Sequence, residues 1–133
     1  PSAVAGRVHL PGYIADPDKA ALLSGATALV LPSLYEGFGF PVLEAQACGT
    51  AVVCANGSSL PEVAGEGALL VNPLDGAALA AAMGRVAGDE ALRRALVERG
   101  YANVRRFTWV GAGERVLAVL EAAGGRRRAA SGG

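Results

Sequence analysis

The chain has 133 residues, which is about the length of one domain, because domains usually hold ~100–200 residues. Hydrophobic residues make up 52% of it and charged residues 18%, a balance that excludes a polar, disordered chain. Its 12 basic and 12 acidic side chains cancel, which argues against a nucleic-acid-binding protein with a basic face. We therefore expect a folded domain with no nucleic-acid partner.

Four short apolar runs bounded by glycine or proline predict parallel strands that are covered on both faces. Helical patterns separate most of these runs, and three more helices are predicted after Asp75, Asp89 and Thr108, each of which can act as an N-cap. The predicted strands are residues 8–10, 28–31, 51–54 and 68–71, and the predicted intervening helices are residues 16–23, 41–48 and a single turn at 61–64. This order predicts an α/β fold with a Rossmann-like parallel sheet flanked by helices.

Residues 1–123 are predicted to form one partial domain, since four strands are fewer than the five or six of a complete doubly wound domain. Residues 124–133 hold glycines, small residues and three arginines at 126–128, and we expect a disordered tail there. The arginines are either solvated or attracted to an anionic membrane surface. No leader and no apolar run of transmembrane length is visible, so the expected location is the cytoplasm, with contact at the inner membrane face as the alternative for the tail.

Two cysteines, Cys48 and Cys54, each lie in an apolar run. This placement favours a buried pair of free thiols over a disulfide or a metal site. We therefore predict no bound metal and assign these thiols no chemistry.

The most informative segment is residues 31–44, which follows a predicted strand and places Glu36 and Glu44 eight residues apart. Open parallel sheets bind their ligands at the carboxyl ends of the strands. Gly37 and Gly39 allow a tight turn, and Pro41 starts the following helix, whose free amides and positive dipole end can bind a diphosphate or a developing oxyanion. A carboxylate can accept two hydroxyl hydrogen bonds, so one glutamate for each sugar ring would suit a sugar nucleotide.

This segment resembles the Glu-x7-Glu signature of the retaining, nucleotide-sugar-dependent glycosyltransferases with two Rossmann domains, known as the GT-B fold, and in particular their group 1, family 4-like members. The resemblance extends over residues 7–122. It includes the patterns Val8-His9-Leu10-Pro11-Gly12-Tyr13, Pro32-Ser33, Ala47-Cys48-Gly49, Ser58-Ser59-Leu60-Pro61-Glu62-Val63, Leu70-Val71-Asn72-Pro73 and Arg106-Phe107-Thr108-Trp109.

The resemblance implies that Glu36 hydrogen-bonds the donor sugar as the catalytic residue and that Glu44 binds the ribose hydroxyls. It implies further donor contacts from the loop amides and, near the nucleobase, from an earlier loop; these residues are Gly37, Phe38 and Gly39, and Gly12 and Tyr13. Such enzymes work without a bound metal or another cofactor, and the nucleotide sugar is a substrate. The acceptor is not implied.

Two departures from the family pattern stand out. Ala51 takes the place of a usual proline, which removes rigidity but no chemical group. The arginine and lysine that grip the diphosphate in this family precede the strand that Val8 begins, and so does the N-terminal Rossmann domain. The resemblance therefore implies the later part of a C-terminal, donor-binding domain, which by itself would bind donor weakly and transfer little.

Two other functions stay open at this stage. Glu36 and Glu44 could be the paired carboxylates of a glycoside hydrolase, which lie ~5–5.5 Å apart in retaining enzymes and ~6.5–9.5 Å apart in inverting ones. The chain could also be a non-catalytic nucleotide-binding or interaction module, for which the sugar of a nucleotide sugar would make no difference to binding.

Overall fold

The computed structural model describes residues 5–130, and the side chains of residues 6–123. Its core is a parallel sheet in the order β1-β2-β3, with β1 at Ala28–Leu31, β2 at Ala51–Ala55 and β3 at Ala68–Val71. In the register of the sheet, Ala28 lies opposite Ala51, and Val52 lies opposite Ala68. The helical elements are η1 (Ala5–Arg7), α1 (Asp16–Gly25), α2 (Phe40–Ala47), α3 (Leu60–Ala64), α4 (Gly76–Gly88), α5 (Glu90–Val104) and α6 (Trp109–Ala130).

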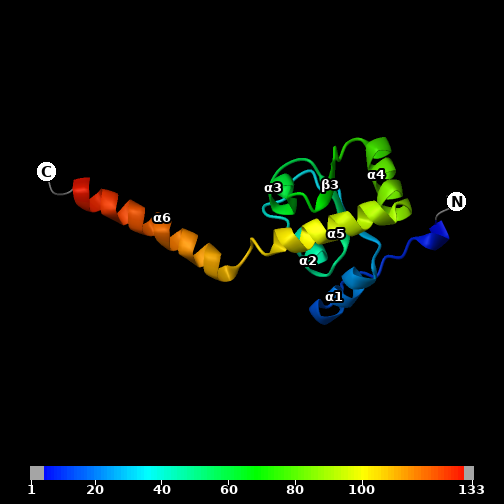
Figure 1. Cartoon of the computed structure of the whole chain (residues 1–133), viewed down its shortest axis with the longest axis horizontal. Coiled ribbons are helices and arrows are strands. Elements are labelled where there is room, and N and C mark those ends of the chain that lie inside the picture. Colours follow the sequence, from blue (N-terminus) through cyan, green and yellow to red (C-terminus); the bar gives the residue numbers. More distant parts are fainter. Residues whose placement is uncertain (1–4, 131–133) are drawn as a thin grey trace.

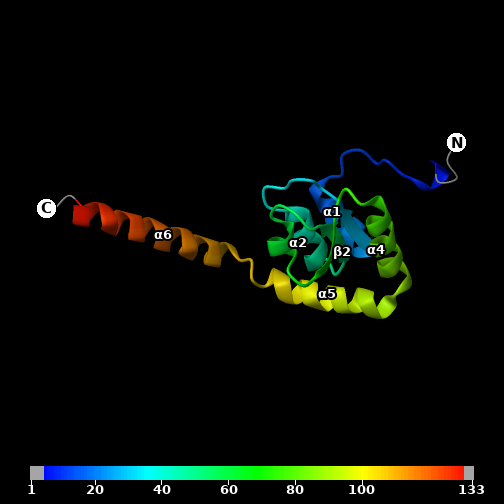
Figure 2. The same cartoon turned by 90° about the horizontal axis from the view of Figure 1, so that it is seen from above.

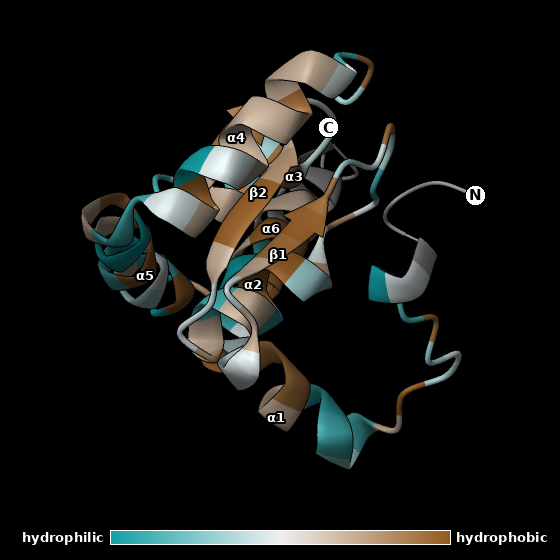
Figure 3. Cartoon of the chain, turned by 90° about the vertical axis from the view of Figure 1, so that its right-hand side faces the viewer, coloured by the Kyte–Doolittle hydropathy of each residue, from teal (hydrophilic) through white to brown (hydrophobic). Residues whose placement is uncertain are grey.

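The central strand β2 is buried at every residue, and from Ala51 to Cys54 its side chains alternate between two apolar clusters. On one face Val52 and Cys54 pack with residues of α2 and α3, and on the other Val53 packs with residues of α4 and α5. Figure 3 shows β1 and β2 between α4 on one side and α1 and α2 on the other. The predicted α/β fold, a parallel sheet flanked by helices, is confirmed.

Predicted helix starts agree with the structure. Asp75 accepts a hydrogen bond from the amide of Ala78 at 2.9 Å, and Asp89 accepts one from the amide of Leu92 at 2.9 Å. Thr108 Oγ1 accepts one from the amide of the third residue after it at 3.0 Å. These bonds satisfy amides that a helix leaves without intrahelical partners, so all three predicted N-caps are confirmed.

The predicted strand at residues 8–10 is wrong. Residues 8–10 are neither helix nor strand, Val8 is 60% exposed and Leu10 is 91% exposed. Among the described residues the two ladders of the sheet join β1 to β2 and β2 to β3, and the run at residues 8–10 pairs with none of these strands. Two apolar residues, Val8 and Leu10, with neither a ladder nor a covering helix bury too little surface to hold a strand.

A buried pair of amide side chains joins three helices. Gln46 Nε2 on α2 donates to the carbonyl oxygen of Ala64 at the end of α3, at 2.9 Å. Asn103 Nδ2 on α5 lies 2.8 Å from both Gln46 Oε1 and the carbonyl oxygen of Val63. Buried polar groups of this kind are stable only when they are paired, and here the pairing fixes α2 against α3 and α5.

The last helix, α6, projects away from the rest of the molecule (Figures 1 and 2). Its apolar side chains are exposed, Trp109 by 87% and Leu120 by 63%. The helix continues through Gly124 and Gly125 to Ala130. The structure does not describe residues 131–133 or the side chains of residues 124–130. The predicted boundary at residue 123 and the predicted membrane contact of the three arginines therefore stay predictions. None of the described helices has the length and apolar character needed to cross a membrane.

The two thiols differ in their surroundings. Cys54 on β2 is fully buried, whereas Cys48 at the end of α2 is half-buried, and both are free. The expectation of free thiols is confirmed, and the expectation that both are buried holds for Cys54 only. Cys48 follows the last residue of α2, and its position at the helix end leaves one side of the residue open.

Candidate functional site at the carboxyl ends of the strands

The predicted donor-binding residues that follow β1, from Glu36 to Glu44, lie near the edge of the sheet where its parallel strands end. The loop that follows β1, residues 32–39, is called the Glu36 loop below, and it leads directly into α2. The turn that follows β2 holds Ser58 and Ser59, called the serine turn below, and leads into α3. Because the strands are parallel, both connections leave the sheet at the same edge, where this class of fold binds its ligands.

Glu36 is half-buried and held on both its side chain and its backbone. Its carboxylate oxygen Oε1 accepts a hydrogen bond from Ser33 Oγ at 2.8 Å. Its backbone amide lies 3.3 Å from Ser58 Oγ, and its carbonyl oxygen lies 2.7 Å from Ser58 Oγ and 2.9 Å from Ser59 Oγ. The Glu36 loop is therefore tied to the serine turn, 22 residues further along the chain, as well as to itself.

The loop amides are free of backbone partners. Within the described part of the chain, Gly37, Phe38 and Gly39 donate no hydrogen bond to a backbone carbonyl. Gly39 is the N-cap of α2, with φ 107° and ψ 41°, and it has no side chain with which to cap the helix. A helix N-terminus without protein acceptors is a favourable place for a phosphate or a carboxylate. This is the geometry that the sequence predicted for the loop.

Phe38 belongs to a small aromatic cluster beside this helix start. Its ring centroid lies 4.8 Å from that of Phe40 and 6.0 Å, edge-on, from that of Phe107, which follows α5. Phe38 is still 39% exposed, and Leu34 and Tyr35 in the same loop are exposed by 69% and 81%. The Glu36 loop thus presents apolar side chains to solvent beside the free amides.

Glu44 lies on α2, one helical turn beyond the Glu36 loop, and forms an ion pair that the sequence did not predict. Its Oε1 lies 3.1 Å from Nζ of Lys19 on α1, which also lies 3.3 Å from Asp16 Oδ1. Hydrogen bonds, first to Glu44 and then to Asp16, raise the pKa of Lys19 above its ordinary value of 10.5. Lys19 is the only lysine of the chain, but no local signal in the sequence places it opposite Glu44.

Gly12 and Tyr13 are separate from the Glu36 loop. Gly12 has φ 72°, and Tyr13 is 90% exposed in the segment before α1. Tyr13 lines an open hollow of about 530 Å³ with residues that include Asp18 and Leu22 of α1. The helix that bears these two residues also bears Lys19, so α1 is the element shared by this hollow and Glu44. Neither Glu36 nor Glu44 lines the hollow.

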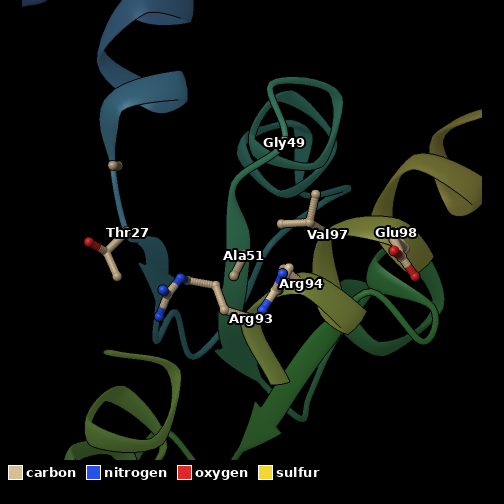
Figure 4. A pocket seen from close by; sticks show the side chains of 8 residues that line it. Thr27, Gly49, Ala51, Arg93, Arg94, Val97 and Glu98 are labelled. Atoms are coloured by element: carbon tan, nitrogen blue, oxygen red, sulfur yellow. The ribbon is translucent and has the colours of Figure 1, made fainter. Parts of the chain in front are cut away.

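A second hollow, of about 370 Å³, lies at the opposite edge of the sheet (Figure 4). Thr27 and Ala51, which line it, stand at the amino ends of β1 and β2, and α5 contributes Arg93 and Arg94. Arg93 Nη1 donates to the carbonyl oxygen of Val86 at 2.8 Å, near the end of α4. This guanidinium therefore supports the junction of α4 and α5, and the hollow contains none of the predicted site residues.

Comparisons with known proteins agree on one family. The family model described as "Glycosyl transferases group 1" matches residues 3–103. The chain is 41% identical over 104 residues to O-antigen chain mannosyltransferase B of Escherichia coli, covering 78% of this chain and 27% of that protein. It is 39% identical over 120 residues to MMP alpha-(1->4)-mannosyltransferase of Mycolicibacterium hassiacum, covering 87% of this chain and 29% of that protein.

A solved structure gives the same answer. The chain superposes on sucrose-phosphate synthase from Thermosynechococcus elongatus with a TM-score of 0.79 and 35% sequence identity, covering 90% of this chain and 32% of that one. The chain therefore spans less than a third of the length of these similar proteins.

Proposed function

Since the chain belongs to the group 1 glycosyl transferases, we propose that it is the donor-binding part of an enzyme that transfers a sugar from a UDP- or GDP-sugar to an acceptor. We further propose that the transfer retains the anomeric configuration, as the Glu-x7-Glu signature implies. Membership in a transferase family also sets aside the reading of Glu36 and Glu44 as glycoside hydrolase carboxylates.

One observation carries this proposal: consecutive amides without backbone acceptors stand at the start of α2, between two glutamates. The amides and the positive end of the helix dipole suit the negative diphosphate of a sugar nucleotide. The carboxylates suit its neutral ends, because sugar hydroxyls donate hydrogen bonds to carboxylate oxygens. A ligand with a central anion and a polyol on each side matches this order of groups.

The two glutamates are proposed to bind different parts of the donor. Glu44 would bind the ribose hydroxyls and Glu36 the transferred sugar. Oε1 of Glu44 is bonded to Lys19, and Oε1 of Glu36 is bonded to Ser33. The second oxygen of each carboxylate can still accept a hydrogen bond from a hydroxyl. Gly12 and Tyr13 would meet the nucleobase, since the hollow that Tyr13 lines adjoins the helix that holds Glu44 through Lys19.

The proposed chemistry is electrostatic. In a retaining transfer through an oxocarbenium-like transition state, positive charge grows on the sugar and negative charge on the leaving diphosphate. Glu36 would stabilise the first charge, and the amides of Gly37 and Gly39 the second. The leaving phosphate would accept the proton of the acceptor hydroxyl, so that this step needs no histidine base in the domain.

Transfer is proposed to require a further domain, the N-terminal Rossmann domain that the family resemblance implies. The exposed Leu34 and Tyr35 beside the site and the exposed apolar face of α6 support a covering surface of this kind. The proteins that this chain matches are also much longer, since the matched residues make up only 27% and 29% of the two mannosyltransferases. The 133-residue chain itself should therefore bind donor weakly and transfer little.

Titration of the ¹⁵N-labelled chain with UDP, GDP, UDP-glucose and GDP-mannose tests the proposal, because NMR measures weak binding and reports residue by residue. At least one ligand should shift the amide signals of Gly37 and Gly39. Indifference to all four ligands would overturn the proposal. Binding that the sugar leaves unchanged would instead favour a non-catalytic nucleotide-binding module.

Substitution of the two glutamates tests the division of labour. Glu44→Gln should weaken plain nucleoside diphosphates and nucleotide sugars alike, by roughly 1–3 kcal/mol for a lost charged hydrogen bond. Glu36→Gln should weaken only the sugar-bearing ligands. Glu66→Gln, an exposed glutamate before β3 at the other edge of the sheet, is the matched control and should change neither. Equal weakening of plain UDP or GDP by Glu36→Gln would contradict the assignment.

A further inference from the structure

We propose that the hydroxyls of Ser58 and Ser59 are positioning groups that aim the amides of Gly37 and Gly39 at the diphosphate of the donor. This inference rests on the proposed function of the Glu36 loop. It concerns two residues that belong to a different loop from the signature and that approach it only in the folded chain.

The contacts between the two loops are short, numerous and directed at the backbone. Ser58 Oγ donates to the carbonyl oxygen of Glu36 at 2.7 Å and accepts from its amide at 3.3 Å. Ser59 Oγ lies 2.9 Å from the same carbonyl oxygen and 2.7 Å from that of Phe38, so its single proton is shared between the two. The serine turn thus engages the backbone on both sides of Gly37.

Because the peptide bond is planar, these contacts to the carbonyl groups also fix the direction in which the loop amides point. The peptide bonds of the described chain are trans, and in a planar trans peptide the carbonyl and the following amide point in opposite directions. The carbonyl groups of Glu36 and Phe38 point toward the serine turn. The amides of Gly37 and Gly39, which share those two peptide planes, must therefore point away from it, on the side where no backbone carbonyl accepts them.

Ser59 contacts the Glu36 loop instead of capping its own helix with its side chain. It occupies the N-cap of α3, where a serine usually accepts a hydrogen bond from an amide of its own helix. Its side chain makes no such bond, and its hydroxyl instead lies against the Glu36 loop. A cap would stabilise α3 by roughly 1 kcal/mol, so the observed contact replaces a favourable local interaction with one that serves the loop.

Ser58 also adopts a costly backbone conformation. Its φ of 56° makes it the one non-glycine residue with positive φ in the described part of the chain. Such a conformation persists only where the surrounding structure imposes it, and it tends to occur at functional sites. Glycine would adopt this φ without strain, but glycine has no hydroxyl with which to bond both the amide and the carbonyl of Glu36.

The residue after the serine turn holds the other end of the loop. Leu60 is fully buried, and its Cδ2 would lie 2.8 Å from a Cβ placed on Gly39. Ser58, Ser59 and Leu60 thus contact the Glu36 loop from Glu36 to Gly39, the N-cap of α2. One continuous segment after β2 therefore determines the direction of the loop amides.

Four variants test the inference: Ser58→Ala, Ser59→Ala, Ser59→Thr and, as a matched control, Ser24→Ala on the exposed surface of α1. Affinities for UDP, GDP and the corresponding sugar nucleotides are measured by NMR titration, and stability by urea unfolding. Both serine-turn alanine variants should raise Kd for plain and sugar-bearing ligands by the same factor, about five- to tenfold. Ser59→Thr keeps the hydroxyl and should restore wild-type affinity, and Ser24→Ala should change nothing.

A second measurement separates positioning from folding. Amide exchange and the chemical shifts of Gly37 and Gly39, recorded without ligand, should change in the serine-turn alanine variants. If Ser59→Ala failed to fold, Ser58→Gly would take its place, because it removes the hydroxyl and the strain together. Unchanged affinities in folded alanine variants, with the wild type still binding, would overturn this inference alone. A wild-type chain that bound none of the ligands would overturn the proposed function and this inference with it.

Discussion

Replacing Gly39 with alanine should destabilise the fold by ~2–5 kcal/mol. With φ at 107° and ψ at 41°, the residue is in the left-handed region, where a side chain costs ~1–2 kcal/mol. The new Cβ would also lie 2.8 Å from Leu60 Cδ2, well inside an ordinary carbon–carbon contact of ~3.5–4.0 Å. Leu60 is fully buried, so its displacement overpacks the core at a further ~1–3 kcal/mol.

Urea unfolding followed by circular dichroism measures this loss. At an m value of ~2 kcal/mol/M, the midpoint of Gly39→Ala should fall by about 1–2.5 M. Gly37→Ala is the matched control, two residues away in the same loop, since its Cβ would meet nothing within 4 Å and its φ lies outside the left-handed region. Its stability should change by less than ~0.5 kcal/mol. Equal midpoints for the two variants would refute the reasoning.

The Leu60→Ala background separates the two causes. Leu60→Ala alone should cost ~2–5 kcal/mol, because it leaves a cavity in the core. In that background Gly39→Ala no longer meets the leucine, so its cost should fall to the backbone contribution of ~1–2 kcal/mol. The difference is the coupling energy of a double-mutant cycle. A coupling energy of zero would show that the contact with Leu60 has no part in the effect.

Two further predictions concern the core. Burial raises the pKa of Cys54 from 9.0 to about 11. Between these pH values the unfolded chain loses a proton that the folded chain keeps. The free energy of unfolding should therefore fall by ~2–3 kcal/mol as the pH rises through this window. Urea unfolding at pH 8–11 should show this fall in the wild type but not in Cys54→Ala, and equal pH dependence would contradict it. Gly67→Ala would bring a Cβ within 2.7 Å of Gly100 Cα, a backbone atom of α5, and should destabilise the chain by more than ~2 kcal/mol. Gly84→Ala, in open space on α4, should gain ~0.5–1 kcal/mol, and equal urea midpoints for the two alanine variants would contradict this reasoning.

The elements that the sequence predicted well are those set by neighbouring residues. The N-caps at Asp75, Asp89 and Thr108 act within three residues of themselves. The apolar runs at β1, β2 and β3 carry their own signal. Residues 8–10 carry the same signal, but a strand also needs a partner, and partners are not local information.

The sequence predicted the composition of the site but not its supports. Glycines, glutamates and a helix start in one short segment predicted free amides at the start of α2. The ion pair of Lys19 with Glu44 joins residues 25 positions apart, and the contact of Ser58 with Glu36 joins residues 22 positions apart. No periodicity or spacing rule relates such residues. They meet because α1 packs against α2 and because two parallel strands release their loops at one edge.

This arrangement explains why the same edge can be both rigid and open. The carbonyls of Glu36 and Phe38 are held by the serine turn, and α2 is fixed from below by Gln46 and Asn103. The opposite side of the loop has free amides beside exposed Leu34 and Tyr35. On the proposed function, the domain preorganises half of a site, because electrostatic stabilisation of a leaving diphosphate becomes strong only once water is excluded. The half that excludes water must then come from the surface that covers these exposed side chains.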